Sequence, residues 1–355
     1  MSSLVICTMQ AMSKNKKLYT YLLLPITLLY FGIVYWRNLF YKYGFFISKE
    51  LPCKVISIGN ITTGGTGKTP TVIFLCELLK EKGHNVAILS RGYKRSSRGT
   101  LIVSKGSGPE KKWEETGDEP QLMALRLPWV PIVVDQNRYR GGLCLIKEFS
   151  PDIILMDDGF QHRAIVRDFD FVLINSNDSI DDHRLLPLGR LREPWNNIKR
   201  ANALIITKVN WNTIKPFLSK KVKEVGIPTF KSSSKISISR LFNNMDSNTS
   251  SSNYKKAYIV SGIGDTKSFH LATSKMGYDI CGHSTFSDHF SFSQRDLNQV
   301  LIKTKNANAD VILTTEKDWV KLQKVQINFP VIVIELKITI EPKNQLYELL
   351  SPIIK

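Results

Sequence analysis

A glycine-rich segment, residues 56–70 with the sequence ISIGNITTGGTGKTP, is the part of the chain best suited to hold phosphate. Gly67, Lys68 and Thr69 fit the motif G-x-x-x-x-G-K-[ST], but Thr62 stands where that motif has its first glycine. In this motif backbone N–H groups point at phosphates, the lysine reaches the outer phosphates, and the next hydroxyl holds Mg²⁺. A strand-like run precedes the segment and an amphipathic run follows it, so the sequence predicts a nucleotide site. The predicted nucleotide-binding residues are Thr62, Thr63, Gly64, Gly65, Thr66, Gly67, Lys68 and Thr69.

An acidic pair follows another apolar run. Ile153–Met156 precede Asp157 and Asp158. This is the Walker B pattern, in which a carboxylate at the end of a strand faces the metal of the phosphate loop. An aspartate turn that ends an ordinary strand is the alternative. The presence of a phosphate loop in the same chain favours the metal role.

Two further acidic motifs supply candidates for a general base, which must lie within hydrogen-bonding reach of a substrate hydroxyl. TGDEP carries Asp118 and Glu119, and FSDHFSFS carries Asp288 and His289. An Asp–His pair between the two motifs could serve, although spacing alone does not show it. His283, Asp288 and His289 could instead hold a metal, but they lack zinc-type spacing. A surface histidine is the remaining alternative.

The turn-rich loop RLLPLGRLREP carries Arg184, Arg190, Arg192 and Glu193. Arginines beside a phosphate site can neutralise transition-state charge or bind an anionic substrate. A solvated basic loop is equally compatible with the sequence.

The elements that must position these residues form an α/β pattern. Short β-branched runs alternate with helical stretches from Lys54 onward, as in a parallel sheet covered on both faces. Ligands of such sheets bind beyond the carboxyl ends of the strands, so the motifs should meet at one edge. A polar break at Phe242–Tyr254 separates a second α/β series. The sequence predicts an anchoring segment (1–50), a phosphate-loop domain (51–240) and a smaller C-terminal α/β domain (241–355).

Composition narrows the class of partner. The 355-residue chain has a formal net charge of +18, which favours nucleic acid, an anionic membrane or phosphorylated substrates, although a basic proteome has the same effect. Its five cysteines form no C-x-x-C pair, which fits a reducing cytosolic compartment.

The N-terminal segment is apolar. Leu18–Trp36 carries no charge, and its length is close to the ~20 residues that cross a bilayer. Lysines precede it, and aromatic and basic residues follow it, as at a membrane interface. A spanning helix and a helix sunk in one leaflet both fit, whereas no cleavage site for a signal peptide follows.

Seven motifs in their order along the chain resemble one known family. They are GNITTGGTGKTP, SRGYKR, TGDEP, DDGFQHR, LLPLGRLREP, FSDHF and TEKDWVKL. Together they resemble the tetraacyldisaccharide 4′-kinases, the lipid A 4′-kinases of Gram-negative bacteria. The resemblance runs nearly from end to end, and the loop T-x-G-G-T-G-K-T with DDGFQHR is its most specific part. Lys94 departs from the family's S-R-G-Y-G.

The resemblance implies a kinase that uses ATP and Mg²⁺ to phosphorylate the 4′-hydroxyl of a tetraacylated disaccharide 1-phosphate, giving lipid IVA. It implies a P-loop NTPase-like domain, a smaller α/β domain, and an active site between them. On the family's pattern Asp118 is the general base and His289 its partner. Glu119 and Arg192 place substrate and phosphates. The expected Mg²⁺ residues are Thr69, Asp157, Asp158 and Gln161.

The same reading places the protein at the cytoplasmic face of the inner membrane, with an acylated lipid as substrate and no obligatory protein partner. A membrane-recruited P-loop ATPase or GTPase switch is the main alternative, but such proteins often have lysine where Thr63 stands. A nucleic-acid-binding ATPase is less consistent, because no basic stripe interleaved with aromatics is visible.

Overall fold

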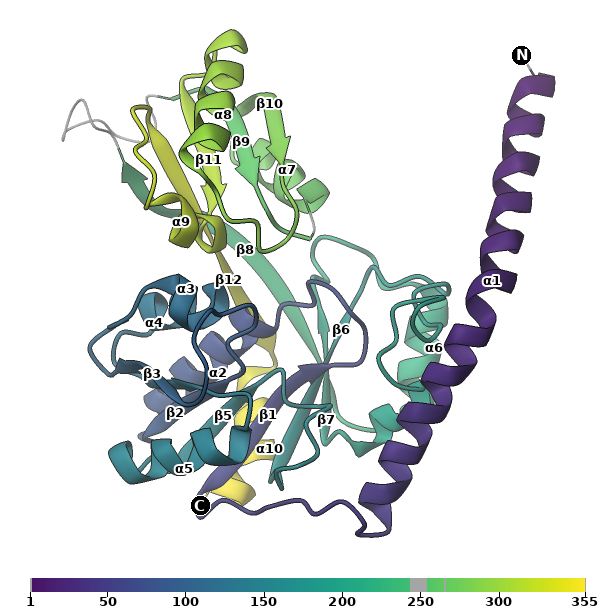
Figure 1. Cartoon of the computed structure of the whole chain (residues 1–355), viewed down its shortest axis with the longest axis vertical. Helices are drawn as coiled ribbons and strands as arrows, with labels where there is room; N and C mark the ends of the chain where they lie inside the picture. The colour runs from purple at the N-terminus through teal and green to yellow at the C-terminus, as the bar shows by residue number, and fades with distance from the viewer. Residues whose placement is uncertain (1, 243–253, 265, 355) are drawn as a thin grey trace.

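The fold is one twelve-stranded sheet with helices on its faces and a long N-terminal helix beside it (Figure 1). The computed structural model describes residues 2–242, 254–264 and 266–354. Most of the predicted break at Phe242–Tyr254 therefore lies outside the described residues. The strands are β1 (Lys54–Asn60), β2 (Val86–Ser90), β3 (Leu101–Lys105), β4 (Pro131–Val134), β5 (Ile153–Asp157), β6 (Phe169–Asn175), β7 (Ala203–Thr207), β8 (Thr229–Phe242), β9 (Lys256–Ser261), β10 (Asp279–Thr285), β11 (Val311–Thr315) and β12 (Val331–Glu341).

Apart from the first and the last, the helices lie between these strands in the chain, as the alternating pattern predicts. In chain order they are α1 (Ser2–Lys42), α2 (Lys68–Glu81), α3 (Trp113–Thr116), α4 (Asp118–Arg126), α5 (Arg138–Phe149), the 3₁₀ helix η1 (Trp195–Arg200), α6 (Pro216–Val225), α7 (Thr266–Lys275), α8 (Gln294–Asn306), α9 (Glu316–Leu322) and α10 (Lys343–Ile354).

Two parallel sets of strands share the sheet, whose order is β10-β9-β11-β12-β8-β7-β6-β1-β5-β2-β4-β3. The antiparallel pair β12–β8 joins the two sets, and β3 is antiparallel to β4 at the far edge. Figure 1 shows β8 and β12 running from the lower part of the molecule to the upper part. The predicted α/β class, with a P-loop-like sheet and a second α/β series, is confirmed.

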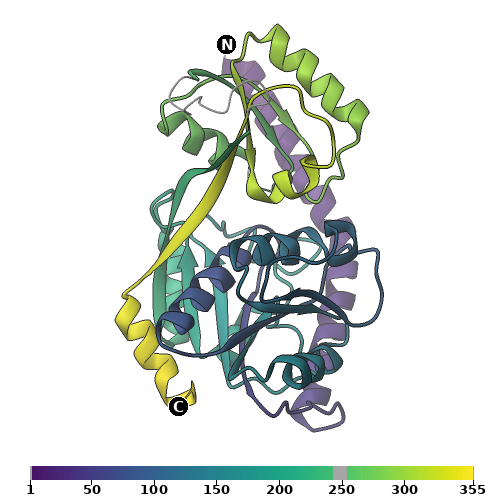
Figure 2. The ribbon, with the colours of Figure 1, turned by 90° about the vertical axis from the view of Figure 1, so that its left-hand side faces the viewer.

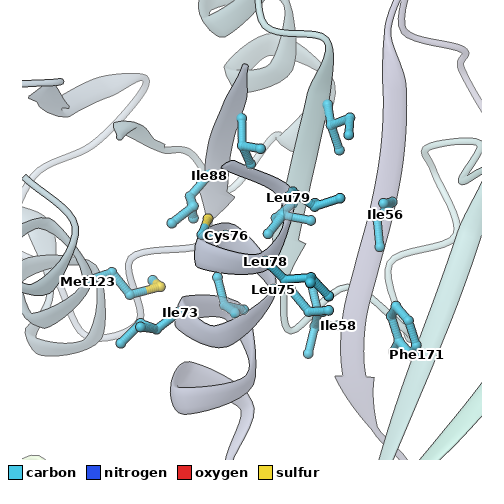
Figure 3. Packing of buried hydrophobic residues seen from close by; sticks show 14 of the residues in the cluster. Ile56, Ile58, Ile73, Leu75, Cys76, Leu78, Leu79, Ile88, Met123 and Phe171 are labelled. Atoms are coloured by element: carbon cyan, nitrogen blue, oxygen red, sulfur yellow. The ribbon is translucent and has the colours of Figure 1, made fainter. Parts of the chain in front are cut away.

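Helix α2, which follows the phosphate loop, is held by the main core. Leu75, Leu78 and Leu79 of α2 are fully buried against Ile56 and Ile58 of β1 (Figure 3). The neighbouring Val55 belongs to the cluster on the opposite face, because successive side chains of a strand alternate between faces. A strand buried on both faces holds its carboxyl end, and therefore the phosphate loop, in a fixed position.

The C-terminal helix returns to this core. Leu346, Leu350 and Ile354 of α10 are buried in the same cluster as α2 and β1. Figure 2 shows α10 (yellow) beside the lower part of the molecule, away from β9–β11. The strands β9, β11 and β12 have separate clusters of their own on their two faces. The chain thus passes from the first set of strands to the second through β8 and returns through β12.

Candidate active site

The phosphate loop joins the end of β1 to the start of α2. Gly67 caps α2 with a φ of 86°, in the left-handed region that favours glycine. Thr62 is fully buried, and its hydroxyl lies 3.5 Å from a carboxylate oxygen of Asp178. The amide nitrogen of Asn60 donates to the hydroxyl of Thr66 at 2.9 Å. The side chain that replaces the usual glycine is therefore packed beneath the loop, which leaves the loop's outer surface free for phosphate.

Arg190 of the arginine loop lies against the phosphate loop. The N–H of Thr63 donates to the carbonyl of Arg190 at 2.7 Å, and the Arg190 guanidinium donates to the carbonyl of Thr63. Gly64 has a φ of 107°, and a Cβ built there would collide with that guanidinium. Arg184 does not join this site: it is half exposed and paired with Asp181 at 3.1 Å.

The acidic pair at the end of β5 faces Lys68. Asp158 Oδ1 lies 3.6 Å from Lys68 Nζ and 3.0 Å from Arg192 Nη1. Burial would raise the pKa of Asp158, but the charges of Lys68 and Arg192 outweigh it and lower that pKa. Asp157 is buried and accepts a hydrogen bond from Ser90, while its Oδ1 has no hydrogen-bond partner among the described residues. Burial and the nearby charges of Glu119 and Asp158 raise the pKa of Asp157 to about 7.

Gln161 and Arg192 complete this edge. Arg192 Nη1 donates to both oxygens of Asp158 and lies 3.3 Å from Gln161 Oε1. The Gln161 amide nitrogen donates to the carbonyl of Asn60 at the end of β1. His162 is neutral here, because burial and nearby arginines (Arg138 first among them) lower its pKa to about 4.

These oxygens fit a magnesium ion. Mg²⁺ in nucleotide sites is usually held by one or two carboxylates together with waters and substrate phosphates, and not by an all-protein cage. The unpartnered, buried Oδ1 of Asp157 suits such a ligand, and the charge of Asp158 acts on it. Within the described ranges no cluster of three His, Cys, Asp or Glu side chains could hold a metal. The alternative metal site at His283, Asp288 and His289 is therefore not found there.

Asp118 and His289 meet across the boundary between the two parts of the sheet. His289 Nδ1 lies 2.9 Å and 2.8 Å from the two oxygens of Asp118. Asp118 is the first residue of α4, where the helix dipole favours a carboxylate. Burial alone would raise the pKa of Asp118; the hydrogen bond with His289 and the charges of Lys317, His289 and Lys321 lower it.

Two lysines from α9 enter this cluster, and no role was predicted for them from the sequence. Lys317 Nζ lies 2.9 Å from Asp288, 3.5 Å from Glu119 and 3.9 Å from Asp118. Lys321 is fully buried, 3.2 Å from Asp318 and 3.9 Å from Asp118. Residues 317 and 321 are one helical turn apart in TEKDWVKL, a spacing that places both ammonium groups on one face. That spacing is a signal in the sequence from which these two lysines could have been assigned to the site.

Glu119 connects the two halves of the site. It lies 3.5 Å from Lys317 beside the Asp118–His289 pair, and its charge contributes to the raised pKa of Asp157. A carboxylate pair with a histidine therefore lies within electrostatic range of the Walker B residues and the phosphate loop. A phosphate loop, an acidic strand end, arginines and an adjacent acid–histidine pair define a P-loop phosphotransferase.

The particular family follows from comparison with known proteins. Residues 19–355 match the model of the family described as tetraacyldisaccharide-1-P 4′-kinase. A tetraacyldisaccharide 4′-kinase of Aquifex aeolicus is 38% identical over 330 residues, covering 92% of this chain and 97% of that protein. One from Chlorobium limicola is 34% identical over 304 residues, covering 85% of this chain and 86% of that protein. The chain belongs to the tetraacyldisaccharide 4′-kinase family, and it is a kinase.

A solved structure agrees with this assignment. The crystal structure of LpxK from Aquifex aeolicus in complex with ATP superposes with a TM-score of 0.75 at 37% identity. The match covers 95% of this chain and 100% of that one. The predicted family, kinase activity and use of ATP are thus confirmed, while the roles of individual residues stay predictions.

Proposed function

We propose that this kinase transfers the γ-phosphate of ATP to the 4′-hydroxyl of a tetraacyldisaccharide 1-phosphate, producing lipid IVA. The observation that carries the proposal is the contact of Asp118 with His289, next to Glu119, whose charge acts on Asp157 of the Walker B pair. A hydroxyl acceptor needs a base beside the phosphate site, whereas simple nucleotide hydrolysis needs only a positioned water.

Each group in the site then has a role. Asp118 accepts the proton of the 4′-hydroxyl while that oxygen forms its bond to the γ-phosphorus. The bond from this phosphorus to the β–γ bridging oxygen breaks, and ADP departs with the electron pair. His289 orients Asp118 and stabilises its charge, and Glu119 helps to place the acceptor. The loop from Thr62 to Thr69 binds the phosphates, and Lys68 and Arg192 neutralise charge on them.

Asp157, Asp158, Thr69 and Gln161 would hold Mg²⁺ with the ATP phosphates. When bound, the ion would supply positive charge that neutralises the ATP phosphates. In this structure Arg192 and Lys68 lie against the carboxylate of Asp158. The positions of these two side chains therefore determine how far that carboxylate can also bind Mg²⁺.

We also propose that the protein works at the cytoplasmic face of the inner membrane. One helical stretch, Thr20–Lys42, is long and apolar enough to cross a membrane, and only 11% of its most apolar window is buried. Leu22 and Leu29 are more than 60% exposed. A formal charge of +18 adds attraction to an anionic surface. The division of the chain into domains at 51–240 and 241–355 stays a proposal. Helix α10 belongs to the second range in sequence, but it packs in the core formed by α2 and β1 of the first range.

Membrane attachment is tested by placing a glutamate on α1 and, as a control, on an exposed residue outside α1. Leu22→Glu and Leu29→Glu should reduce sedimentation of the protein with anionic vesicles, because a carboxylate is costly in the hydrocarbon layer. Ile180→Glu is the control, since Ile180 is 65% exposed but lies outside α1. Equal sedimentation of all three variants would show that α1 does not carry the attachment.

A labelled-phosphate assay tests the reaction. Purified protein is mixed with ATP labelled in the γ-phosphate and tetraacyldisaccharide 1-phosphate in detergent micelles. The label should appear in lipid and only slowly as inorganic phosphate. Release of inorganic phosphate without labelled lipid would favour the nucleotide-switch alternative.

A further inference from the structure

The lower end of α1 is built into the catalytic part of the molecule. Tyr21, Leu22 and Leu29 higher in the helix are between 63% and 72% exposed. Figure 1 shows the N-terminal part of α1 standing apart from the other elements, whereas the lower, C-terminal part runs beside them. From Tyr30 onward, polar side chains of α1 bond to the rest of the protein. An anchor alone would not need such contacts.

The first set of contacts joins α1 to the arginine loop. The hydroxyl of Tyr30 donates to the carbonyl of Arg192 at 2.7 Å. The amide of Asn38 donates to Glu193 at 3.0 Å, and Arg37 lies 3.3 Å from the same carboxylate. These bonds hold the carbonyl of Arg192 and the carboxylate of Glu193.

Glu193 is the centre of this set. Its side chain is fully buried, and both of its oxygens accept hydrogen bonds from Arg200, at 2.8 Å and 3.1 Å. Asn197 donates to it at 3.0 Å. A buried carboxylate bonded on all sides fixes the groups around it, and losing one partner leaves charge uncompensated.

The second set joins α1 to the loop after β5. Arg163 of DDGFQHR donates to the carbonyl of Asn38 at 3.1 Å, and its guanidinium lies 5.0 Å from the centre of the Tyr41 ring. Asn38 thus contacts both loops, through its carbonyl and through its side chain. Asp158 and Gln161 precede Arg163 on the same loop.

The two loops meet again at the phosphate edge, where Arg192 bonds to Asp158 and Gln161. The lower end of α1 therefore contacts both loops, at the carbonyl of Arg192 and at the side chains of Glu193 and Arg163, while Arg192 joins the two loops through its bonds to Asp158 and Gln161. A misplacement of about 1 Å in such a group can cost a hundredfold in rate.

We propose that the lower end of α1, residues 30–41, is a positioning element of the kinase site, with Tyr30, Asn38 and Glu193 as positioning residues that act through Arg192. The packing of α1 against the rest of the protein and the assembly of Arg192, Asp158 and Gln161 beside the phosphate loop are then one structural event. A protein whose helix is displaced would bind membranes poorly and also lose catalytic power. The inference rests on the proposed role of Arg192 at the phosphates.

Single substitutions in detergent micelles separate positioning from anchoring, because no bilayer is present. Tyr30→Phe removes one hydrogen bond and should lower kcat roughly three- to tenfold. Asn38→Ala removes the side-chain hydrogen bond to the buried Glu193 and the 3.5 Å contact with Arg163, while the carbonyl of residue 38 still accepts from Arg163. Because a buried carboxylate then lacks one donor, this variant should lower kcat about tenfold or more. The KM for the lipid should change less than kcat, and sedimentation with vesicles should match the wild type. Tyr35→Phe and Tyr21→Phe are the controls, since both rings are more than half exposed on α1.

A double-mutant cycle excludes a merely structural role. If Tyr30 and Asn38 act through Arg192, then Tyr30→Phe and Asn38→Ala should cause little further loss of kcat in an Arg192→Ala background. Kinetics within twofold of the wild type for both single variants, or losses that multiply with that of Arg192→Ala, would overturn the inference. Those results leave the proposed function intact, provided that the wild type phosphorylates the lipid. Failure of the wild type to do so would instead overturn the proposed function.

Discussion

His289 Nδ1 lies 2.8 Å from Asp118 Oδ2, although the two residues are 171 positions apart in the chain. Asp118 begins α4 beside the first set of strands, and His289 lies in the loop before α8 in the second set. His289 has a φ of 62°, and the ring of Tyr93 packs edge-on against its imidazole. The pair forms only when the two sets of strands are joined, so the Asp118–His289 contact requires the whole sheet.

Loss of either member of this pair should be severe. We expect Asp118→Ala and His289→Ala each to lower kcat by about 10²–10⁴-fold, which is the usual contribution of a general base. Because they act as a unit, the double variant should lose less than the product of the two losses. Steady-state kinetics with the lipid acceptor measures this, with the exposed His270→Ala as control. Independent, multiplicative losses would argue against a dyad.

Lys317 should set the pH at which Asp118 becomes active. Burial raises the pKa of Asp118, whereas the hydrogen bond with His289 and then the ammonium group of Lys317 lower it. Lys317→Met removes that positive charge, so the pKa of Asp118 should rise. The acidic limb of the kcat/KM profile should then move to higher pH. Lys303→Met is the exposed control in the same part of the chain. An unshifted limb in Lys317→Met would show that Lys317 does not act on the base.

Asp157 should make stability fall with rising pH. Its pKa is raised from 3.8 to about 7, so the folded chain binds this proton more tightly than the unfolded chain does. The stabilisation is present below 3.8 and is lost as the pH rises towards about 7, at ~1.4 kcal/mol per pH unit. Asp157→Asn should remove this slope.

Chemical denaturation in detergent, without nucleotide or divalent ions, measures the slope. Between pH 5 and pH 7 the wild type should lose roughly 2–3 kcal/mol of unfolding free energy relative to Asp157→Asn. The exposed Glu148→Gln serves as the control variant and should follow the wild type. Parallel curves for the wild type and Asp157→Asn would mean that this carboxyl is not strained by burial.

The phosphate loop offers a matched pair of glycines. Gly64 has a φ of 107° and no room for a Cβ beside the Arg190 guanidinium, whereas a Cβ at Gly65 meets nothing within 4 Å. Gly64→Ala should lower the free energy of unfolding by about 1–3 kcal/mol, because it adds both backbone strain and a collision. Gly65→Ala should change it by less than about 0.5 kcal/mol. Denaturant titration of the nucleotide-free protein measures both, and equal values would contradict the observed loop geometry.

Local patterns were enough to predict most of the sheet. The apolar β-branched runs of the first set became buried strands, because such runs satisfy both faces of a parallel sheet, whereas the edge strand β10 is mostly half-buried. The strand β8 was not predicted, since its sequence TFKSSSKISISRLF is largely polar. Pairing with β12, about a hundred residues further on, stabilises it, and no local window contains that partner.

The motifs of the site could be predicted from the sequence, but the contacts between them could not. The phosphate loop and the acidic pair are contiguous in sequence, so their chemistry is visible there. The contact between Asp118 and His289 depends on how β8 and β12 join the two sets of strands, and spacing left it as one hypothesis among several. The bonds from Tyr30 and Asn38 to residues 192–193 carry no local signal at all, because a tyrosine or an asparagine at a helix end is ordinary.

The position of the transferred phosphate tests the central proposal most directly. Tetraacyldisaccharide 1-phosphate is incubated with ATP, Mg²⁺ and the purified full-length protein in detergent micelles, and the lipid product is examined by ³¹P and two-dimensional NMR. The account predicts one new phosphomonoester, on the 4′-oxygen, that is absent when Lys68→Ala replaces the wild type. A phosphate on another oxygen, or unmodified lipid accompanied by ADP and inorganic phosphate, would contradict it.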